Sequence, residues 1–232
     1  MINVTSIIQG QTATSLKKPK GNLIEQKLNF DIQLAPVGSK HRNEIEAFIK
    51  QGFAKAYGAK ISITTPHLLA LSNGNYKAAL GIRSGHDELF VEQYLSGVIE
   101  QQAVFVDNKV KRQEIVEFSH LFSNAKRFTI PLFMVTAVSL FCLNYKYLVF
   151  SGTEKVLKLL DKAGVQNTFI GNADHHKIQA STDDWGSYYS TNPQIMAVSL
   201  LEVMSLIAKH PLYTKMFQSL DSQIGQICQQ LR

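Results

Sequence analysis

The chain has 232 residues, of which 45% are hydrophobic and 18% charged, and this composition is typical of a globular domain with a real hydrophobic core. The net charge of +6 allows anionic partners, but no dense cluster of Lys and Arg with interleaved aromatic residues is present, which disfavours nucleic-acid binding. Two cysteines, Cys142 and Cys228, are too few for a disulfide framework or a zinc site.

The N-terminal segment, residues 1–24, is polar and weakly patterned, and we expect it to form a flexible arm. It lacks a basic start followed by an apolar core, so no signal peptide is predicted and a reducing, cytoplasmic location is the default expectation. The next segment, "LNFDIQL" at 28–34, alternates apolar and polar residues, which predicts a first strand.

A helix is predicted from about Ser39, which can cap it, to Gly58, which ends it. Its apolar residues recur at helical spacing, and they are Ile45, Phe48, Ile49, Phe53 and Ala56. Two apolar runs then flank the turn signal Asn-Gly-Asn at 73–75, so residues 67–85 are predicted to form a hairpin.

Beyond the hairpin, helices and strands alternate. The predicted elements are a helix at 87–102, a strand at 112–122, a helix at 124–145, a strand at 146–152, a helix at 154–164, a strand at 165–171, an amphipathic helix at 194–210 and a helical tail at 211–232. This order predicts a mixed α/β (α+β) fold in which helices flank a central sheet. We expect three parts: the arm 1–24, a main domain 25–195 and a C-terminal helical extension 196–232.

The uncharged run "FTIPLFMVTAVSLFCLNY" at 128–145 is long enough to suggest a membrane span. Several features favour a buried helix instead. Pro131 lies near the start, where a helix tolerates proline, and four polar residues dilute the run. A predicted strand also follows after a short link, as in a buried crossover. We therefore expect a core helix and no stable membrane insertion.

Three motifs resemble the GNAT acyltransferases, and more closely their acyl-homoserine-lactone synthase relatives. The motifs are "GIRSG" at 81–85, "ELFVEQYL" at 88–95 and "EFSHLF" at 117–122. Glu117 matches the acidic position of the synthase strand motif, whereas His120 stands where those synthases have arginine. The resemblance implies a GNAT-like, autoinducer-synthase-like mixed sheet.

A closer resemblance is to the thermostable hemolysin family of bacterial proteins. It covers about residues 41–195 and is carried by "YGAKISITTPHLLAL", "LFVEQYLSGVIE", "RQEIVEF", "SGT" and "WGSYYSTNP". This chain departs from the family at one place. The family's glutamate is usually followed, one residue on, by Gly-Asn-Leu-Ala, whereas the residues after Glu117 here are Phe118, Ser119, His120 and Leu121. The family takes its name from lysis of cells, but its fold resemblance implies acyl transfer.

The implied reaction moves an acyl group from an acyl thioester, carried by coenzyme A or by the phosphopantetheine of an acyl carrier protein, to a small amine. The amine must lose a proton, and Glu117 is the predicted base or acceptor-binding residue, with His120 assisting or replacing it. Tyr188 or Tyr189 is predicted to protonate the leaving thiolate or to line the acyl pocket, with Tyr188 as the catalytic candidate and aromatic packing alone as the alternative. The alternative for Glu117 is a structural pairing with Arg83 or Arg112. Glu114 is an odd number of residues away, so it is expected on the opposite face of the strand.

The remaining predicted site residues bind the substrates. Lys126, Arg127 and Asn124 lie at the start of the helix after the "EFSHLF" strand, where phosphate groups of the donor can bind. The usual glycine-rich signature is missing there, and an acidic acyl carrier protein would suit the basic net charge. The residues predicted to contact the acyl group or the amine are Arg83, Phe90, Trp185 and Tyr189.

Two other functions stay open. One is a membrane-active hemolysin that inserts the stretches 128–145 and 196–209, and the other is a non-catalytic acyl-binding protein. No metal is expected, because the adjacent histidines of "ADHH" at 173–176 point apart and no fixed third ligand is visible.

Overall fold

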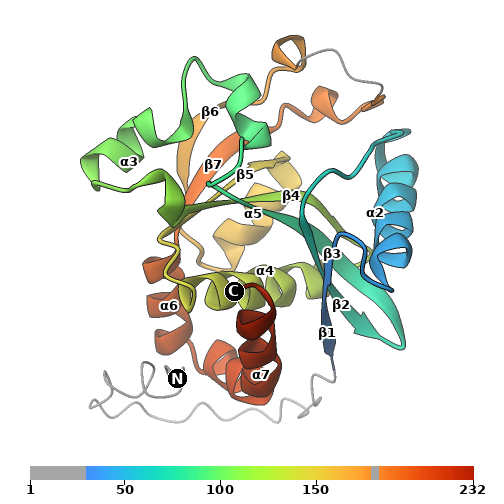
Figure 1. Ribbon diagram of the computed structural model, residues 1–232, viewed down its shortest axis with the longest axis vertical. Helices are drawn as coiled ribbons and strands as arrows, with labels where there is room; N and C mark the ends of the chain where they lie inside the picture. The colour runs from blue at the N-terminus through green and yellow to red at the C-terminus, as the bar shows by residue number, and fades with distance from the viewer. Residues whose placement is uncertain (1–29, 179–182) are drawn as a thin grey trace.

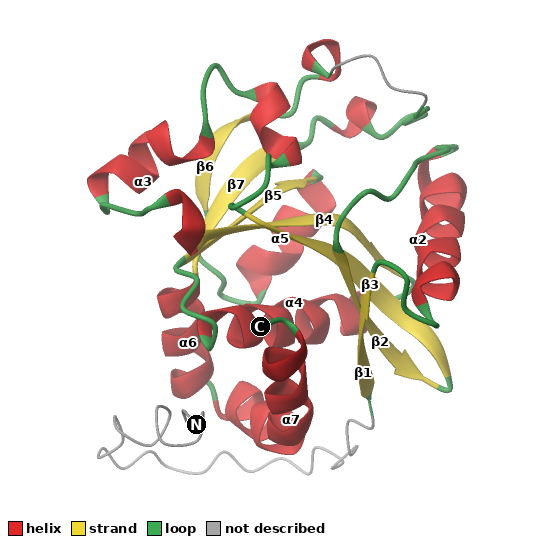
Figure 2. Ribbon diagram, in the orientation of Figure 1, coloured by secondary structure: helices red, strands yellow, loops and turns green. Residues whose placement is uncertain are grey.

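The computed structural model describes residues 30–178 and 183–232. The predicted arm, 1–24, and the first residues of the predicted strand at 28–34 lie outside the described residues. The described chain forms one mixed sheet with helices on both faces (Figures 1 and 2). The predicted fold class is therefore confirmed.

The sheet has seven strands in the order β1-β2-β3-β4-β5-β7-β6. Their bounds are β1 Asp31–Pro36, β2 His67–Asn73, β3 Asn75–Ser84, β4 Ile115–Ser123, β5 Tyr147–Gly152, β6 Thr168–Asn172 and β7 Gln194–Ser199. All neighbouring strands are antiparallel except β4 and β5, which run parallel. The predicted hairpin is β2–β3, and Gly74 turns it with a φ of 70°, a conformation that glycine adopts without strain.

Helix α2, Arg42–Tyr57, covers one face of the sheet over β1 to β4 (Figure 1). Gly58 ends the helix with a φ of 71°, and its N–H donates to the carbonyl oxygen of Ala54. The predicted helix over this segment is thus confirmed. Ile45, Ile49 and Phe53 form its buried stripe.

The other face is covered by four helices (Figure 2). They are α4 Lys126–Phe141, α5 Glu154–Lys162, α6 Leu200–Lys209 and α7 Pro211–Gln230. Helix α4 joins β4 to β5 and is buried along most of its length, because α6 and α7 pack against its outer side. None of the helices in the described residues combines the length and the apolarity that crossing a bilayer requires.

The segment predicted as one helix at 87–102 is instead a series of short turns. These are the 3₁₀ helices η1 Phe90–Tyr94 and η2 Ile99–Gln101, followed by α3 Ala103–Asp107 and the 3₁₀ helix η3 Arg112–Glu114. Tertiary contacts override the helical pattern: Glu92 accepts backbone N–H groups of Leu89 and Ile99 and pairs with Arg112.

The prediction of a helix over 194–210 is wrong for its first part. Residues 194–199 form β7, which pairs with β5 on one side and β6 on the other, and α6 begins only at Leu200. Ile195 and Ala197 pack on one face, while Met196 and Val198 pack on the other. A strand covered on both faces is a continuous apolar run, which periodicity cannot distinguish from a helix. Residues 196–199 therefore belong to the sheet.

Candidate functional site

The parallel strands β4 and β5 separate halfway along β4. Their pairing runs from Ile115 with Tyr147 to Phe118 with Phe150 and then stops, while β4 continues alongside β3. Where β4 leaves β5 it also bulges, because the two residues 120 and 121 lie opposite one residue of β3. His120 adopts a left-handed φ of 52° at this bulge. The result is a V-shaped opening in the sheet.

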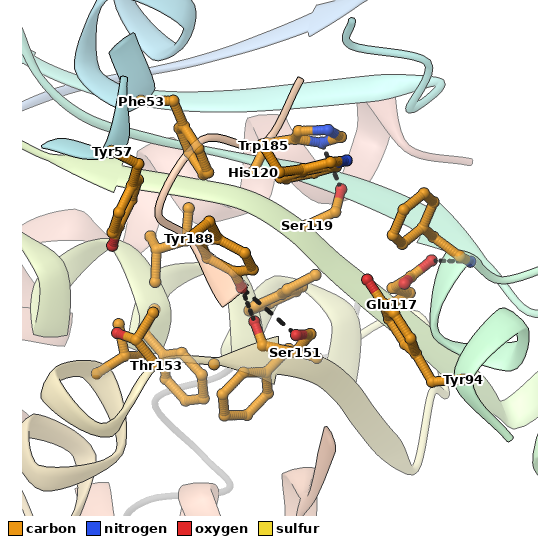
Figure 3. Close-up of a pocket in the computed structure, with 17 residues that line it drawn as sticks. Phe53, Tyr57, Tyr94, Glu117, Ser119, His120, Ser151, Thr153, Trp185 and Tyr188 are labelled. Carbon is orange, nitrogen blue, oxygen red and sulfur yellow. Dashed lines mark hydrogen bonds between the residues drawn. The ribbon is translucent and has the colours of Figure 1, made fainter. Parts of the chain in front are cut away.

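A narrow pocket of about 70 Å³ lies in this opening. Aromatic and aliphatic side chains form most of its wall, with a few polar groups between them (Figure 3). Among the predicted site residues, those that line the pocket are Phe90, Glu117, His120, Trp185 and Tyr188.

Glu117 is buried in the pocket wall, with 1% of its surface exposed. Its two carboxylate oxygens accept the backbone N–H groups of Phe90 and Val91, at 2.8 and 2.9 Å. Burial raises the pKa of Glu117 to about 7, and these two hydrogen bonds and the charge of Arg83 act in the opposite direction. Glu117 is therefore both a titratable group near neutral pH and an anchor for the start of η1.

His120 and Trp185 stack on each other, with ring centroids 6.4 Å apart and planes 18° from parallel (Figure 3). The His120 Nδ1 atom lies 3.0 Å from the Ser119 hydroxyl. Burial and the nearby Arg83 charge together lower the pKa of His120 to about 4. The imidazole is therefore neutral at pH 7 and has a free lone pair, but it is a weaker base than an ordinary histidine.

Tyr188 approaches the opening from the β5 side. Its hydroxyl lies 3.4 Å from both the hydroxyl and the carbonyl oxygen of Ser151, the first β5 residue beyond the last pair with β4 (Figure 3). Burial raises the pKa of Tyr188 to about 12, so the hydroxyl keeps its proton at neutral pH. Trp185 and Tyr57 pack against its ring.

Tyr189 is placed beside the pocket rather than in its lining. Its hydroxyl lies 2.6 Å from that of Tyr94, which does line the pocket, and burial raises the pKa of both phenols. Arg83 also lies outside the lining, directly opposite Glu117 in the β3–β4 register. Its guanidinium donates to the carbonyl oxygens of Glu88 and Thr64, and its Nε has no hydrogen-bond partner among the described residues.

The predicted donor-binding residues are at the N-terminus of α4, outside the pocket lining. Lys126 and Arg127 are exposed in the first turn, which contains no acidic residue, and the Arg127 guanidinium lies 4.8 Å from the Phe128 ring centroid. Asn124 is tied to the β2–β3 hairpin, because its backbone N–H donates to the carbonyl oxygen of Lys77.

The "ADHH" segment forms a short 3₁₀ turn in which the Asp174 carboxylate accepts the backbone N–H of His176. In residues 30–178 and 183–232, no group of three or more His, Cys, Asp or Glu side chains is arranged to hold a metal ion. Glu114 precedes β4 and pairs with Lys146 at 2.8 Å.

Sequence reasoning missed several pocket residues, which are Phe53, Tyr57, Tyr94, Ser119, Ser151 and Thr153. Ser119 is the one with a readable signal, since it lies two residues after Glu117 and a strand with that spacing puts both side chains on one face. The others converge from α2, η1, β5 and the N-cap of α5, and no local pattern marks that convergence.

The chain matches one protein family and resembles several solved structures. The family model described as Thermostable hemolysin matches residues 35–204. No curated protein sequence matches the chain. Among solved structures, the fold is similar to FeeM, an N-acyl amino acid synthase from uncultured soil microbes, with a TM-score of 0.52 and 15% identity over 79% of this chain and 99% of that one.

The AHL synthase LasI is a second similar structure, with a TM-score of 0.50 and 12% identity over 74% of this chain and 90% of that one. TofI in a complex with an inhibitor and MTA gives a TM-score of 0.53 and 9% identity over 79% and 98%. At these identities the likeness shows a shared fold. The chain therefore shares its architecture with FeeM, LasI and TofI.

Proposed function

The chain belongs to the thermostable hemolysin family, and from this premise we propose that it is an N-acyltransferase that moves an acyl group from an acyl thioester to a small amine. This function is supported chiefly by one observation: β4 and β5 separate around an apolar pocket that is lined by Glu117, His120 and Tyr188. The shared fold with an N-acyl amino acid synthase and an AHL synthase supports the same reaction class.

The donor enters through the opening between β4 and β5. Its acyl group lies against the apolar side chains of the pocket, which are Phe118, Leu121, Phe133, Phe150 and Val156. Its phosphates bind at the N-terminus of α4, where free N–H groups and the side chains of Lys126, Arg127 and Asn124 favour an anion. Coenzyme A and the phosphopantetheine of an acyl carrier protein both present such a phosphate, and the net charge of +6 suits an acidic carrier protein.

The amine acceptor binds on the opposite side, between Phe90 and Trp185, and Tyr189 supports this wall from behind through its contact with Tyr94. Glu117 accepts the ammonium proton, which its pKa of about 7 allows near neutral pH, and the positive charge of Arg83 lies behind it. The neutral His120 assists as a second proton acceptor. Both free cysteines fit a reducing, cytoplasmic setting for this reaction.

Tyr188 acts on the leaving sulfur as a hydrogen-bond donor. Its pKa of about 12 exceeds the value of about 8.5 for an ordinary thiol, so full proton transfer from the phenol to a thiolate is uphill. A hydrogen bond from the phenol still stabilises the thiolate as it forms.

A second candidate is a non-catalytic acyl-binding protein. It is favoured by one observation, the engagement of both Glu117 oxygens by backbone N–H groups, which is a structural arrangement. The two functions differ in one property: only the enzyme consumes its thioester when an amine is present.

The deciding experiment is a thiol-release assay with saturated acyl-coenzyme A donors and an acyl carrier protein loaded with the same chains. A panel of amino acids and simple amines is tested with each donor, and the amide is identified by mass spectrometry. Amine-dependent thiol release with a matching amide supports the enzyme. Saturable donor binding without turnover would favour the acyl-binding protein, and dye release from lipid vesicles by the protein alone would favour the hemolysin.

A further inference from the structure

We propose that Ser119 is a nucleophile that receives the acyl group as an ester before it passes to the acceptor. The acyl donor is the thioester of the proposed function, and the covalent step is additional to it. Three features of the structure point to Ser119: its place at the opening, its contact with His120, and the space that Gly81 leaves for its hydroxyl.

Ser119 occupies the apex of the opening. It is the first β4 residue beyond the last pair with β5, Phe118 with Phe150, and it lines the pocket. Its side chain lies on the same face of β4 as Glu117, two residues earlier. A thioester carbonyl that reaches the point where the strands separate therefore meets the Ser119 hydroxyl.

The contact between Ser119 and His120 depends on the backbone. In a regular strand, adjacent side chains point to opposite faces, so a serine and the next residue cannot hydrogen-bond through their side chains. Here the left-handed φ of His120 and the bulge turn the imidazole back onto its own neighbour, with Nδ1 3.0 Å from the Ser119 hydroxyl (Figure 3). A histidine in this conformation is strained, and such strain is concentrated at functional sites.

The imidazole is held and kept neutral. Trp185 stacks on it, with the ring planes 18° from parallel, and burial keeps it uncharged. Because the ring is neutral, Nδ1 can accept the serine proton while the other ring nitrogen carries hydrogen. A nucleophile, a base and a group that orients the base are the three parts of an activated serine.

Gly81 leaves room for the hydroxyl. A Cβ at this position would lie 2.8 Å from the Ser119 oxygen and 2.4 Å from the Thr65 hydroxyl oxygen. Thr65 is 1% exposed and its hydroxyl has no hydrogen-bond partner within residues 30–178 and 183–232, so a second buried donor lies beside the nucleophile. A buried hydroxyl without a partner is available to a negative charge that forms on the acyl carbonyl oxygen.

The chemistry balances without a further reagent. The Ser119 oxygen attacks the thioester carbonyl, its proton passes to His120 Nδ1, the C–S bond breaks, and the thiolate takes that proton and leaves as a thiol. The amine then attacks the ester carbonyl, the bond to the serine oxygen breaks, and the amine proton returns through His120 to that oxygen. Water in place of the amine gives the free acid by the same route.

The experiment uses octanoyl-coenzyme A and octyl fluorophosphonate as probes on the full chain. Without an amine, the wild-type protein is expected to release about one thiol per chain in a burst and to gain one octanoyl mass on the peptide that contains Ser119. The fluorophosphonate should label the same serine. Ser119→Ala should abolish both adducts, and Ser119→Cys should restore acylation as a thioester. His120→Asn, which suits a left-handed backbone, should slow labelling at least tenfold.

Ser72→Ala, a serine of β2 outside the pocket, is the matched control and should be acylated like the wild type. Two results separate this step from the proposed function. Amide formation with no adduct on Ser119, and turnover in Ser119→Ala close to the wild-type rate, would overturn the acyl-serine and leave the acyltransferase standing. An adduct that decays only to free acid with every amine would support the acyl-serine and overturn the amine acceptor.

Discussion

Arg83 and Glu117 are directly opposite each other in strands β3 and β4, yet they form no ion pair within 4 Å. The Arg83 guanidinium donates to Glu88 and Thr64, and the Glu117 carboxylate accepts from the backbone of Phe90 and Val91. The arginine charge still lowers the pKa of Glu117 against the larger effect of burial. Because the Glu117 carboxylate has no direct cationic partner, its pKa stays near 7. Its two oxygens also hold the start of η1.

Glu117→Gln tests both roles. A glutamine offers one acceptor oxygen, so one of the two N–H groups of residues 90 and 91 must face the amide NH₂ group. We expect the free energy of unfolding to fall by about 1–3 kcal/mol, the usual cost of an unsatisfied buried group. If Glu117 is the base, turnover per folded molecule should also fall by about 10²–10⁴-fold.

The matched control for that substitution is Glu114→Gln, which lies outside the pocket and also keeps one acceptor oxygen, for either the Lys111 N–H or Lys146. Denaturant unfolding and thiol release are measured on both variants. An activity loss in Glu117→Gln that merely follows the loss of folded protein would make Glu117 a structural anchor and nothing more.

The pH dependence of stability contains two opposed contributions. The folded-state pKa of Glu117 is raised from 4.5 to about 7, so between these values the folded protein binds more protons and its stability falls as pH rises. The folded-state pKa of His120 is lowered from 6.5 to about 4, so the unfolded chain binds more protons and stability rises with pH. Each shift corresponds to about 3 kcal/mol, and the two largely cancel between pH 4.5 and 6.5.

Single variants should expose each contribution. Relative to the wild type, Glu117→Gln should lose stability on going from pH 7 to pH 5, and His120→Asn should gain it, each by about 2–3 kcal/mol. Urea unfolding at the two pH values measures the differences. Identical pH profiles in all three proteins would mean that neither side chain titrates abnormally in the folded state.

Much of the fold can be read from local patterns, and the exceptions have physical causes. Helix α2 has a clear apolar stripe and a glycine at its end, so its bounds are predictable. Strand β7 is apolar on both faces because β5 and β6 flank it within the sheet, and that removes the alternation that identifies a strand. The segment at 87–102 has helical spacing, but Glu92 and Arg112 fold it into short turns.

The site is less predictable than the fold. Glu117 and His120 were identified because the strand motif that contains them resembles a known pattern. The contact between Ser119 and His120 has no sequence signal, since it requires a left-handed residue and histidine does not mark one as glycine would. Arg83 and Tyr189 were predicted to touch substrate, but they lie behind Glu117 and Tyr94, and only the sheet register reveals this.

Lys126 and Arg127 in the first turn of α4 are expected to favour anion binding and to lower the stability of the helix. Lys126 and Arg127 lie at the positive end of the helix dipole, which disfavours each cation by about 0.3–1 kcal/mol. Lys126→Gln is therefore expected to leave the melting temperature unchanged or slightly raised while weakening coenzyme A binding, more strongly at low salt. Arg127→Gln also loses the contact with the Phe128 ring, so its stability gain should be smaller.

Lys215→Gln on α7 is the control for that pair, because it makes the same charge change at an exposed position of another helix. Calorimetric titration with coenzyme A at two salt concentrations measures the effect. Equal affinities for each single variant, Lys126→Gln and Arg127→Gln, and for Lys215→Gln would place the phosphate site elsewhere.

Gly81→Ala is expected to destabilise the protein by about 1–3 kcal/mol, as overpacking of a closed site usually does. The new Cβ would lie 2.4 Å from the Thr65 hydroxyl oxygen, so β3 or Thr65 must shift. Gly225→Ala in α7 has no heavy atom within 4 Å of its Cβ and should instead gain about 0.5–1 kcal/mol. Thermal unfolding compares the two variants. If Gly81→Ala melts at the wild-type temperature, the hydroxyls of Thr65 and Ser119 rotate away from the new methyl group at no cost in free energy.

Trp185 is the single tryptophan of the chain, and its ring packs against His120, Phe90 and Tyr188 in the pocket wall. Its emission should therefore report on the site. Octanoyl-coenzyme A is expected to change the intensity saturably, with a midpoint that matches the concentration dependence of thiol release. His120→Asn, which removes the stacked ring, should change the emission before any ligand is added. Turnover without any change in Trp185 emission would show that the acyl donor and the acceptor bind away from this wall, and that the opening between β4 and β5 is not where the reaction takes place.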